Sequence, residues 1–163
     1  MAGTLLASCA DEIVKIWIPL HGEESVYDFK DHTEEVLSIA WSPSGPGTPN
    51  ENYPLRLATA SKDKSVKIWD METGKCVVTF NYHTEAVNAV AFSPNCEYLS
   101  SGGENGTVKI YSIRNQKLIK SLSLPEDTNF LSKRIVGLDW DLESRTVAAA
   151  CFSCIILIDM RYF

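Results

Sequence analysis

The sequence predicts an all-β fold: a partial β-propeller with two complete four-stranded blades flanked by two incomplete ones. The first observation is a repeat, because the stretch from His32 to Asp70 recurs from His83 to Tyr111, with His-Thr-Glu and Ser-Pro at matching places. Second, each copy contains short apolar runs with partial two-residue alternation, separated by turn residues, as strands have. Third, the repeat period of about 40 to 50 residues is typical of four-stranded propeller blades.

One strand marks every unit, and in it apolar residues flank a central lysine or leucine. Its copies read IVKIW at 13–17, SVKIWD at 65–70, TVKIY at 107–111 and, more weakly, IILID at 155–159. The interval between the first two copies is the longest because it contains a Pro- and Gly-rich insert, Ser44 to Pro54. This composition indicates a surface loop.

We label the strands of a blade a to d from the central channel outward, which makes the marker strand c. In the first blade we expect b, c and d at 4–9, 13–18 and 25–30. The second blade has a to d at 36–42, 56–61, 66–70 and 76–81, and the third has them at 87–93, 98–103, 108–113 and 118–124. The fourth has a, b and c at 135–141, 146–151 and 155–160. The domain at 1–163 thus divides into an incomplete blade at 1–30, blades at 31–81 and 82–124, and an incomplete blade at 125–163.

Composition and charge narrow the class of protein. The chain has 163 residues, 45% of them hydrophobic, and a formal net charge of -6. A net acidic chain is a poor match for nucleic acid, and a basic peptide suits it better. Five scattered cysteines are an odd number and favour a reducing compartment over a disulfide framework. No run approaches the roughly 18 apolar residues of a membrane helix, so we expect no membrane partner.

Several residues at fixed offsets resemble the WD-repeat pattern. These are the His-Thr turn, the Ser-Pro corner, Asp63 six residues before Trp69, and the Trp69-Asp70 pair. The resemblance implies a buried hydrogen-bonded tetrad in each blade. In the second blade it implies the tetrad His32, Thr59, Asp63 and Trp69. In the third it implies a weaker one, His83, Ser101, Asn105 and Tyr111. The fourth has Leu131, Ala148, Phe152 and Ile158 at these places, and we expect no tetrad there.

Two enzyme readings compete with this one. His, Ser or Thr, and Asp are also the members of a hydrolase triad, but a set that repeats in each blade is typical of structural residues. Cys151 and Cys154 have the spacing of a redox or zinc pair. A structural zinc site needs four ligands, and the sequence has no second CxxC. We therefore expect a non-enzyme without metal or cofactor, and keep a thiol-redox enzyme using Cys151 and Cys154 as the least favoured alternative.

The insert resembles one branch of the family. The run from Ile39 to Asn50, followed by Leu57 to Ser61, is similar to the transducin-β-like corepressor subunits, which are nuclear F-box-like/WD-repeat proteins. The similarity covers roughly residues 4–124 and implies the C-terminal half of a longer propeller, with two open blade edges through which the chain can self-associate. It also implies a nuclear scaffold that binds corepressor and histone deacetylase complex components and histone tails. Another WD-repeat adaptor, such as a ubiquitin-ligase substrate receptor, and a truncated propeller without independent function remain alternatives.

Geometry predicts where such a scaffold binds its partners. Strand a begins at the upper rim, and alternate residues there face the mouth of the channel. The b–c turn adds further side chains to the same rim. The predicted partner-binding residues are Glu35, Leu37, Lys62, Ala86, Asn88, Glu104, Arg134 and Val136. They mix both charge signs, so this rim has no single-sign patch.

Overall fold

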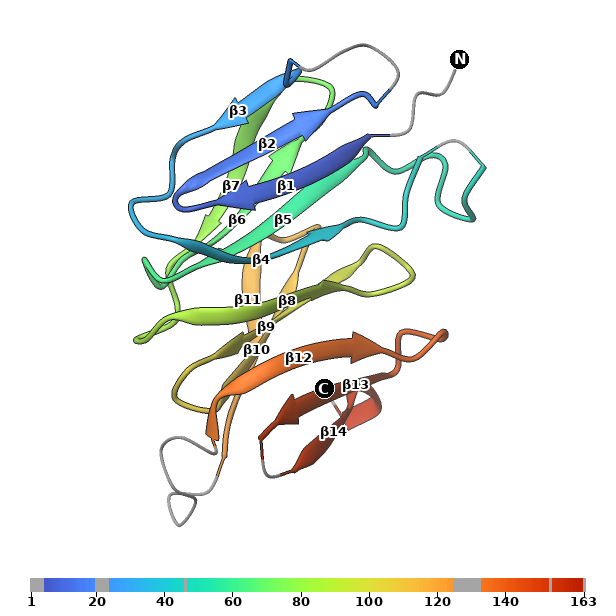
Figure 1. Ribbon diagram of the computed structural model, residues 1–163. Helices are drawn as coiled ribbons and strands as arrows, with labels where there is room; N and C mark the ends of the chain where they lie inside the picture. Colours follow the sequence, from blue (N-terminus) through green and yellow to red (C-terminus); the bar gives the residue numbers. More distant parts are fainter. Residues whose placement is uncertain (1–4, 20–23, 46, 125–132, 153, 163) are drawn as a thin grey trace.

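The computed structural model describes residues 5–19, 24–45, 47–124, 133–152 and 154–162. In this described part the strands form four antiparallel sheets that follow one another along the chain (Figure 1). The first blade contains β1 (Leu6–Ala10), β2 (Ile13–Trp17) and β3 (Tyr27–Phe29), and the second β4 (Val36–Trp41), β5 (Arg56–Ser61), β6 (Val66–Asp70) and β7 (Lys75–Phe80). The third contains β8 (Val87–Phe92), β9 (Tyr98–Gly103), β10 (Thr107–Ser112) and β11 (Lys117–Ser123), and the fourth β12 (Ile135–Trp140), β13 (Thr146–Cys151) and β14 (Ile155–Asp159).

This arrangement confirms the predicted fold class, since two four-stranded sheets lie between two three-stranded ones. The first blade differs most from the expected strands, since β1 begins at Leu6 rather than at residue 4 and β3 begins at Tyr27 rather than at Ser25. The Ser25 hydroxyl donates to the Asp28 carboxylate at 2.5 Å and closes a turn before the strand starts. A short 3-10 turn, Met160–Tyr162, follows β14. Among the described residues, no helix has the length and hydrophobicity that crossing a bilayer requires.

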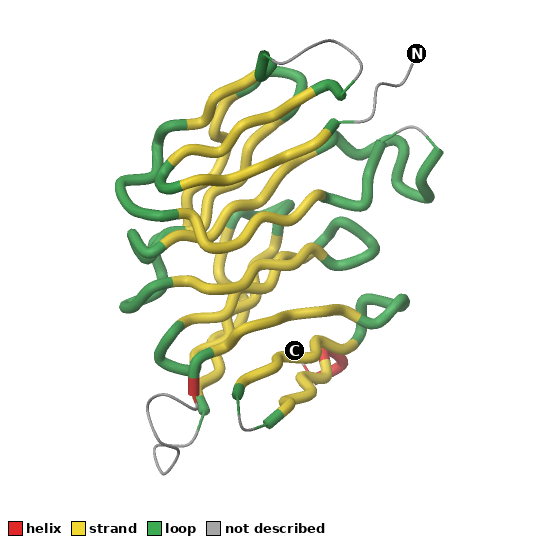
Figure 2. The backbone as a smooth tube through the Cα atoms, in the orientation of Figure 1, coloured by secondary structure: helices red, strands yellow, loops and turns green. Residues whose placement is uncertain are grey.

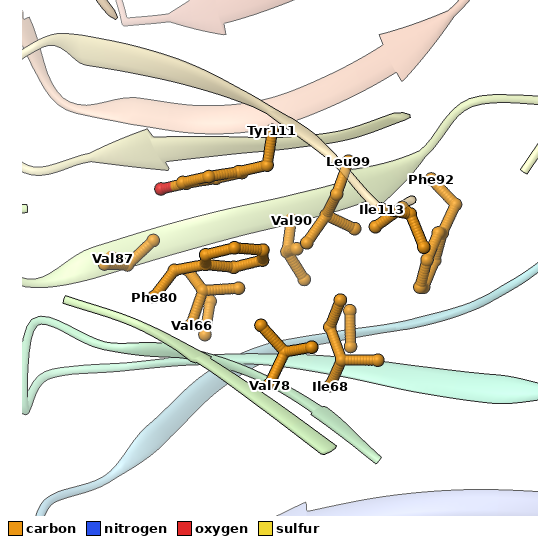
Figure 3. Packing of buried hydrophobic residues seen from close by; sticks show 12 residues of the cluster. Val66, Ile68, Val78, Phe80, Val87, Val90, Phe92, Leu99, Tyr111 and Ile113 are labelled. Atoms are coloured by element: carbon orange, nitrogen blue, oxygen red, sulfur yellow. The ribbon is translucent and has the colours of Figure 1, made fainter. Parts of the chain in front are cut away.

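The blades are stacked so that their inner strands β4, β8 and β12 lie side by side (Figure 1). Both faces of an inner blade are apolar, and the buried clusters therefore lie between blades rather than inside one. The largest of them joins the second blade to the third. Figure 3 shows its side chains, among them Ile68, Phe80, Val90 and Leu99, which are buried from solvent.

An aromatic stack recurs at successive blade interfaces. Phe29, on the outer strand of the first blade, stacks on Trp69 of the second, with ring centroids 4.2 Å apart and planes 7° apart. Phe80, on the outer strand of the second blade, stacks on Tyr111 of the third at 4.2 Å and 15° (Figure 3). At the third interface Leu122 has the equivalent register position and belongs to the same buried cluster as Ile158. Each outer strand thus contributes one side chain that covers the marker strand of the next blade.

The stack predicts a large effect for one substitution. Phe80→Ala should destabilise the chain by about 3 to 5 kcal/mol, because it removes a fully buried ring from the interface between two blades. The measurement is the free energy of unfolding in urea. The matched control is Val77→Ala on the same strand, whose side chain is 40% exposed and whose loss should stay within about 0.5 kcal/mol. Equal losses in the two variants would show that the outer strand does not hold the blades together.

Candidate functional site

In the second blade the predicted tetrad residues form one continuous hydrogen-bonded chain. The Trp69 indole N–H donates to Thr59 Oγ1 at 3.0 Å, and this oxygen lies 2.6 Å from His32 Nε2. His32 Nδ1 lies 2.7 Å from Asp63 Oδ2. His32 precedes β4, Thr59 lies in β5, Asp63 occupies the β5–β6 turn and Trp69 lies in β6, so the chain of bonds ties together every part of the blade except its outer strand.

Each group in this network donates its hydrogen bond in the direction from Trp69 towards Asp63. Because the indole can only donate, the Thr59 hydroxyl donates to His32 Nε2, and the Nδ1–H of His32 donates to Asp63. Burial lowers the pKa of His32, although the Asp63 carboxylate acts in the opposite direction. Burial would raise the pKa of Asp63, but hydrogen bonds from Ser65 and His32 outweigh it and the pKa is lowered. The pair is therefore a neutral imidazole beside an ionised carboxylate.

The third blade has a similar chain with one difference from the expected set. His83 Nε2 lies 2.7 Å from Ser101 Oγ, which lies 2.9 Å from the Tyr111 hydroxyl. On its other side, His83 Nδ1 lies 3.2 Å from Thr107 Oγ1, and that hydroxyl donates to Asn105 Oδ1 at 2.8 Å. Asn105 thus reaches His83 through Thr107 and not directly. The amide lacks the charge with which Asp63 attracts the imidazole N–H.

Sequence reasoning missed the hydroxyl residue two positions after the turn acid or amide. Ser65 donates to Asp63 Oδ1 at 2.6 Å, and Thr107 makes the equivalent bond to Asn105. The signal was present, since Asp-x-Ser and Asn-x-Thr stand at matching repeat positions. Gly103 is also required here, because a Cβ on it would approach Thr107, Asn105 and His83 to within 2.9 Å. The space around His83 is closed on that side.

The terminal blades keep little of this network. In the first blade the Trp17 indole donates to Ser8 Oγ at 2.9 Å. In the fourth, Ala148 and Ile158 carry no polar group, and Phe152 is 71% exposed. Leu131 lies outside the described residues. A hydrolase triad is excluded for the second blade by access, because Thr59 has no exposed surface from which its hydroxyl could attack a substrate.

Cys151 and Cys154 meet at the turn between β13 and β14. Their sulfur atoms lie 2.7 Å apart, with Cys151 buried and Cys154 exposed. Within the described ranges no group of three or more His, Cys, Asp or Glu side chains is arranged to hold a metal ion. The two thiols alone do not supply the four ligands of a structural zinc site.

The predicted rim residues share a backbone feature that the sequence did not reveal. In each of β4, β8 and β12 the pairing with the next strand slips by one residue, which leaves Leu37, Asn88 and Val136 as the extra residue of a β-bulge. A bulge re-aims its side chain and is common beside binding sites. Three successive blades therefore present a bulged residue at the same level of their inner strands.

The charged rim residues are joined to their neighbours. Lys62 Nζ lies 2.5 Å from Glu35 Oε2 within the second blade. Arg134 Nη2 donates to Asn88 Oδ1 at 2.9 Å and links the fourth blade to the third. The backbone N–H of Glu104 donates to the carbonyl of Ala86 at 2.8 Å. Glu35 and Lys62 are exposed, whereas Glu104 and Arg134 are half-buried, so the rim is a set of anchored groups of mixed sign.

The two networks predict different responses to loss of the turn residue. Asp63→Ala should cost about 3 kcal/mol or more, because it strands the buried His32 and Ser65 donors. Asn105→Ala should cost about 1 to 2 kcal/mol, because the groups that lose a partner, chiefly the hydroxyl and backbone N–H of Thr107, were bonded to a neutral amide. Urea unfolding of both variants, with exposed Glu72→Ala as control, measures the difference. Equal losses would contradict the assignment of a stronger network to the second blade.

His83 predicts a loss of stability in acid. Burial, helped by the Lys109 ammonium, lowers the pKa of His83 from 6.5 to about 4. Between pH 6.5 and about 4 the unfolded chain therefore binds a proton at His83 that the folded chain does not bind. The contribution of His83 to the free energy of unfolding is complete above pH 6.5 and falls as the pH drops towards 4. The slope should reach about 1.4 kcal/mol per pH unit. Urea unfolding of the parent and of His83→Gln across this range measures it, and an unchanged slope in the variant would contradict the prediction.

Comparisons with known proteins agree with this geometry. The family model described as "WD domain, G-beta repeat" matches residues 23–70 and 74–112, just over half of the chain. A WD40 repeat-containing protein of Arabidopsis thaliana, HOS15, is 43% identical over 99 residues, which are 60% of this chain and 16% of that protein. The nuclear distribution protein PAC1 of Arthroderma otae is 36% identical over 113 residues, 68% of this chain and 24% of the relative.

A more distant relative extends further along the chain. THO complex subunit 3 of Arabidopsis thaliana is 29% identical over 139 residues, which are 83% of this chain and 41% of that protein. The chain thus spans well under half the length of these curated relatives. The repeated blades, the hydrogen-bonded network that begins at His32, and the match of the family model across both complete blades place this chain in the WD-repeat family.

Proposed function

We propose that the chain is a protein-interaction scaffold of the nuclear corepressor type, which binds histone tails and components of corepressor and histone deacetylase complexes. Membership of the WD-repeat family supports the scaffold role. The corepressor type is supported by the insert and its flanks, from Ile39 to Ser61, which resemble the transducin-β-like subunits. Relatives with names as different as a nuclear distribution protein and a THO complex subunit share the repeat, so the finer assignment depends on the insert.

The observation that carries the proposal is the row of bulges along the upper rim. Leu37, Asn88 and Val136 occupy the same register position on three adjacent inner strands, each held by paired strands on a closely packed blade. Binding residues are most useful where a rigid scaffold fixes their positions. Val136 is 45% exposed, which leaves apolar surface beside the polar groups of this rim.

Charge favours a basic partner at this surface. The chain carries a net charge of -6, and Glu35 and Glu104 stand on the rim with Lys62 and Arg134. Lys62 and Glu35 neutralise each other, and Arg134 keeps its charge while it donates to the neutral Asn88. Complementary charge steers association and rejects wrong partners more than it adds affinity. A lysine-rich histone tail is the partner chemistry that this balance supports.

The proposal predicts separate effects on binding and folding. Glu35→Lys combined with Glu104→Lys should leave the melting midpoint nearly unchanged, since surface charges contribute only about 0 to 1 kcal/mol. The same double variant should bind a fluorescent histone-tail peptide more weakly. The difference should shrink as salt rises, because exposed charges are screened over about 10 Å at 0.1 M. Fluorescence anisotropy titrations at two salt concentrations measure this.

The matched control is Glu72→Lys, in the exposed turn between β6 and β7 on the opposite face. It changes a single charge of the same kind and should bind the peptide as the parent does. If the double variant also binds as the parent does, or if the parent binds no peptide, the rim of this chain is not a histone site.

A further inference from the structure

A cavity opens between the second and third blades at the opposite ends of the strands from the rim. Its volume is about 560 Å³, within the range of about 300 to 1,000 Å³ found for ligand pockets. Figure 2 shows the connections β4–β5 and β8–β9 leaving their sheets on one side. The lining comes from these two connections and from the turn after β10, and includes Tyr53, Arg56, Cys96, Tyr98, Ile113 and Arg114.

The insert forms one wall of this cavity, and hydrogen bonds hold it in place. The Asn50 side-chain amide donates to the carbonyls of Pro43 at 2.9 Å and Pro94 at 2.6 Å, which ties the insert to the corner of the third blade. Ser44 donates to the carbonyl of Pro54 at 3.0 Å. The wall is therefore formed before any ligand arrives, which reduces the ordering that binding requires.

One residue that lines the cavity, Cys96, has a strained backbone conformation. Cys96, in the turn between β8 and β9, has a φ of +59°, the left-handed region that favours glycine. The residue is buried, and its backbone N–H donates to the carbonyl of Ser93 at 3.0 Å. Non-glycine residues in this region are uncommon and cluster at binding sites. The turn thus keeps a side chain in the cavity where glycine would be easier to accommodate.

Two arginines, Arg56 and Arg114, bring positive charge to the lining of the cavity. Within the described residues neither Arg56 nor Arg114 has an acidic partner within 4 Å, and the buried Nε of Arg56 has no hydrogen-bond acceptor. Asp70 pairs with Arg56 across the strands, but its Oδ1 accepts from the backbone of Glu72 and from Thr73.

Glu97 is the one acid among the residues that line the cavity. Its carboxylate already accepts a hydrogen bond from the Asn95 amide at 3.1 Å. The lining therefore carries two guanidinium groups and one carboxylate, on a chain that is acidic overall.

We propose that this cavity binds an acidic peptide segment in which a carboxylate stands next to an apolar residue. The planar guanidinium groups of Arg56 and Arg114 match a carboxylate, with which arginine pairs through two parallel hydrogen bonds. The Tyr53 side chain and Ile113 supply apolar surface for the neighbouring side chain, whereas the Tyr98 ring stacks on Trp140 of the fourth blade. This site lies on the face opposite the rim, prefers the opposite charge and does not depend on the proposed histone binding.

The probe is a short dye-labelled peptide of alternating Glu and Leu, titrated with the full chain and followed by fluorescence anisotropy. Arg56→Met and Arg114→Met should each weaken binding about ten-fold, since each removes one charged pair but keeps the aliphatic stem. The matched control is Arg145→Met, which removes an exposed arginine of the fourth blade that lies outside the cavity. It should bind the peptide as the parent does.

Further probes separate charge recognition from apolar binding. A peptide of the same length with alternating Gln and Leu, the Gln-Leu peptide, should bind at least about ten-fold more weakly than the Glu-Leu peptide. A single-stranded oligonucleotide should bind no better than the Gln-Leu peptide. Thermal melting checks that each variant is folded. Because Arg114 lies on an exposed turn, its variant keeps the test valid if Arg56→Met fails to fold. Absence of Glu-Leu binding, equal binding of Gln-Leu, or unchanged affinity in folded arginine variants would overturn the proposal.

Discussion

The structure depends on the packing of one blade against the next. A sheet of three or four strands has two apolar faces, and neither can be buried within the sheet itself. The buried clusters accordingly join β3 to β6, β7 to β10 and β11 to β14, and Phe29 of β3 and Phe80 of β7 cover Trp69 and Tyr111. Stability in such an array is a sum of blade and interface contributions, so each blade depends on its neighbours. The most exposed large hydrophobic residues of the described strands, Ile155 and Leu157, belong accordingly to a terminal sheet.

The polar network and the aromatic stack act on the same residues. Trp69 donates to Thr59 at one edge of its ring system and receives Phe29 on its face. Tyr111 does the same with Ser101 and Phe80. The hydrogen bonds therefore hold each ring at the angle that stacking on the phenylalanine of the preceding blade needs, and the stack shields the bonds from water. This coupling explains why a His, a Thr and an Asp in reach of one another serve the fold here rather than catalysis.

The two ends of the strands offer two different surfaces. At one end, bulges in the inner strands and the b–c turns form a rim of anchored side chains with mixed charge. At the other end, the insert reaches from the second blade to the third and walls a cavity with two arginines. The proposed histone-tail site and the proposed acidic-peptide site lie at opposite ends of the strands, so occupation of one would leave the other open.

By itself the sequence determined the strands and their grouping into blades, while the tetrad residues came from the resemblance to WD repeats. It could do so because two-residue alternation, turn residues and repeat offsets are local properties, and each copy checks the others. Only the tertiary structure decided the rest. The relay through Thr107 depends on the gap that neutral Asn105 leaves beside His83, and the bulges at Leu37, Asn88 and Val136 depend on how each inner strand pairs with its neighbour. The cavity unites Tyr53, Cys96 and Arg114 from three separate connections, and no local pattern can report a contact that exists only after two blades have packed together.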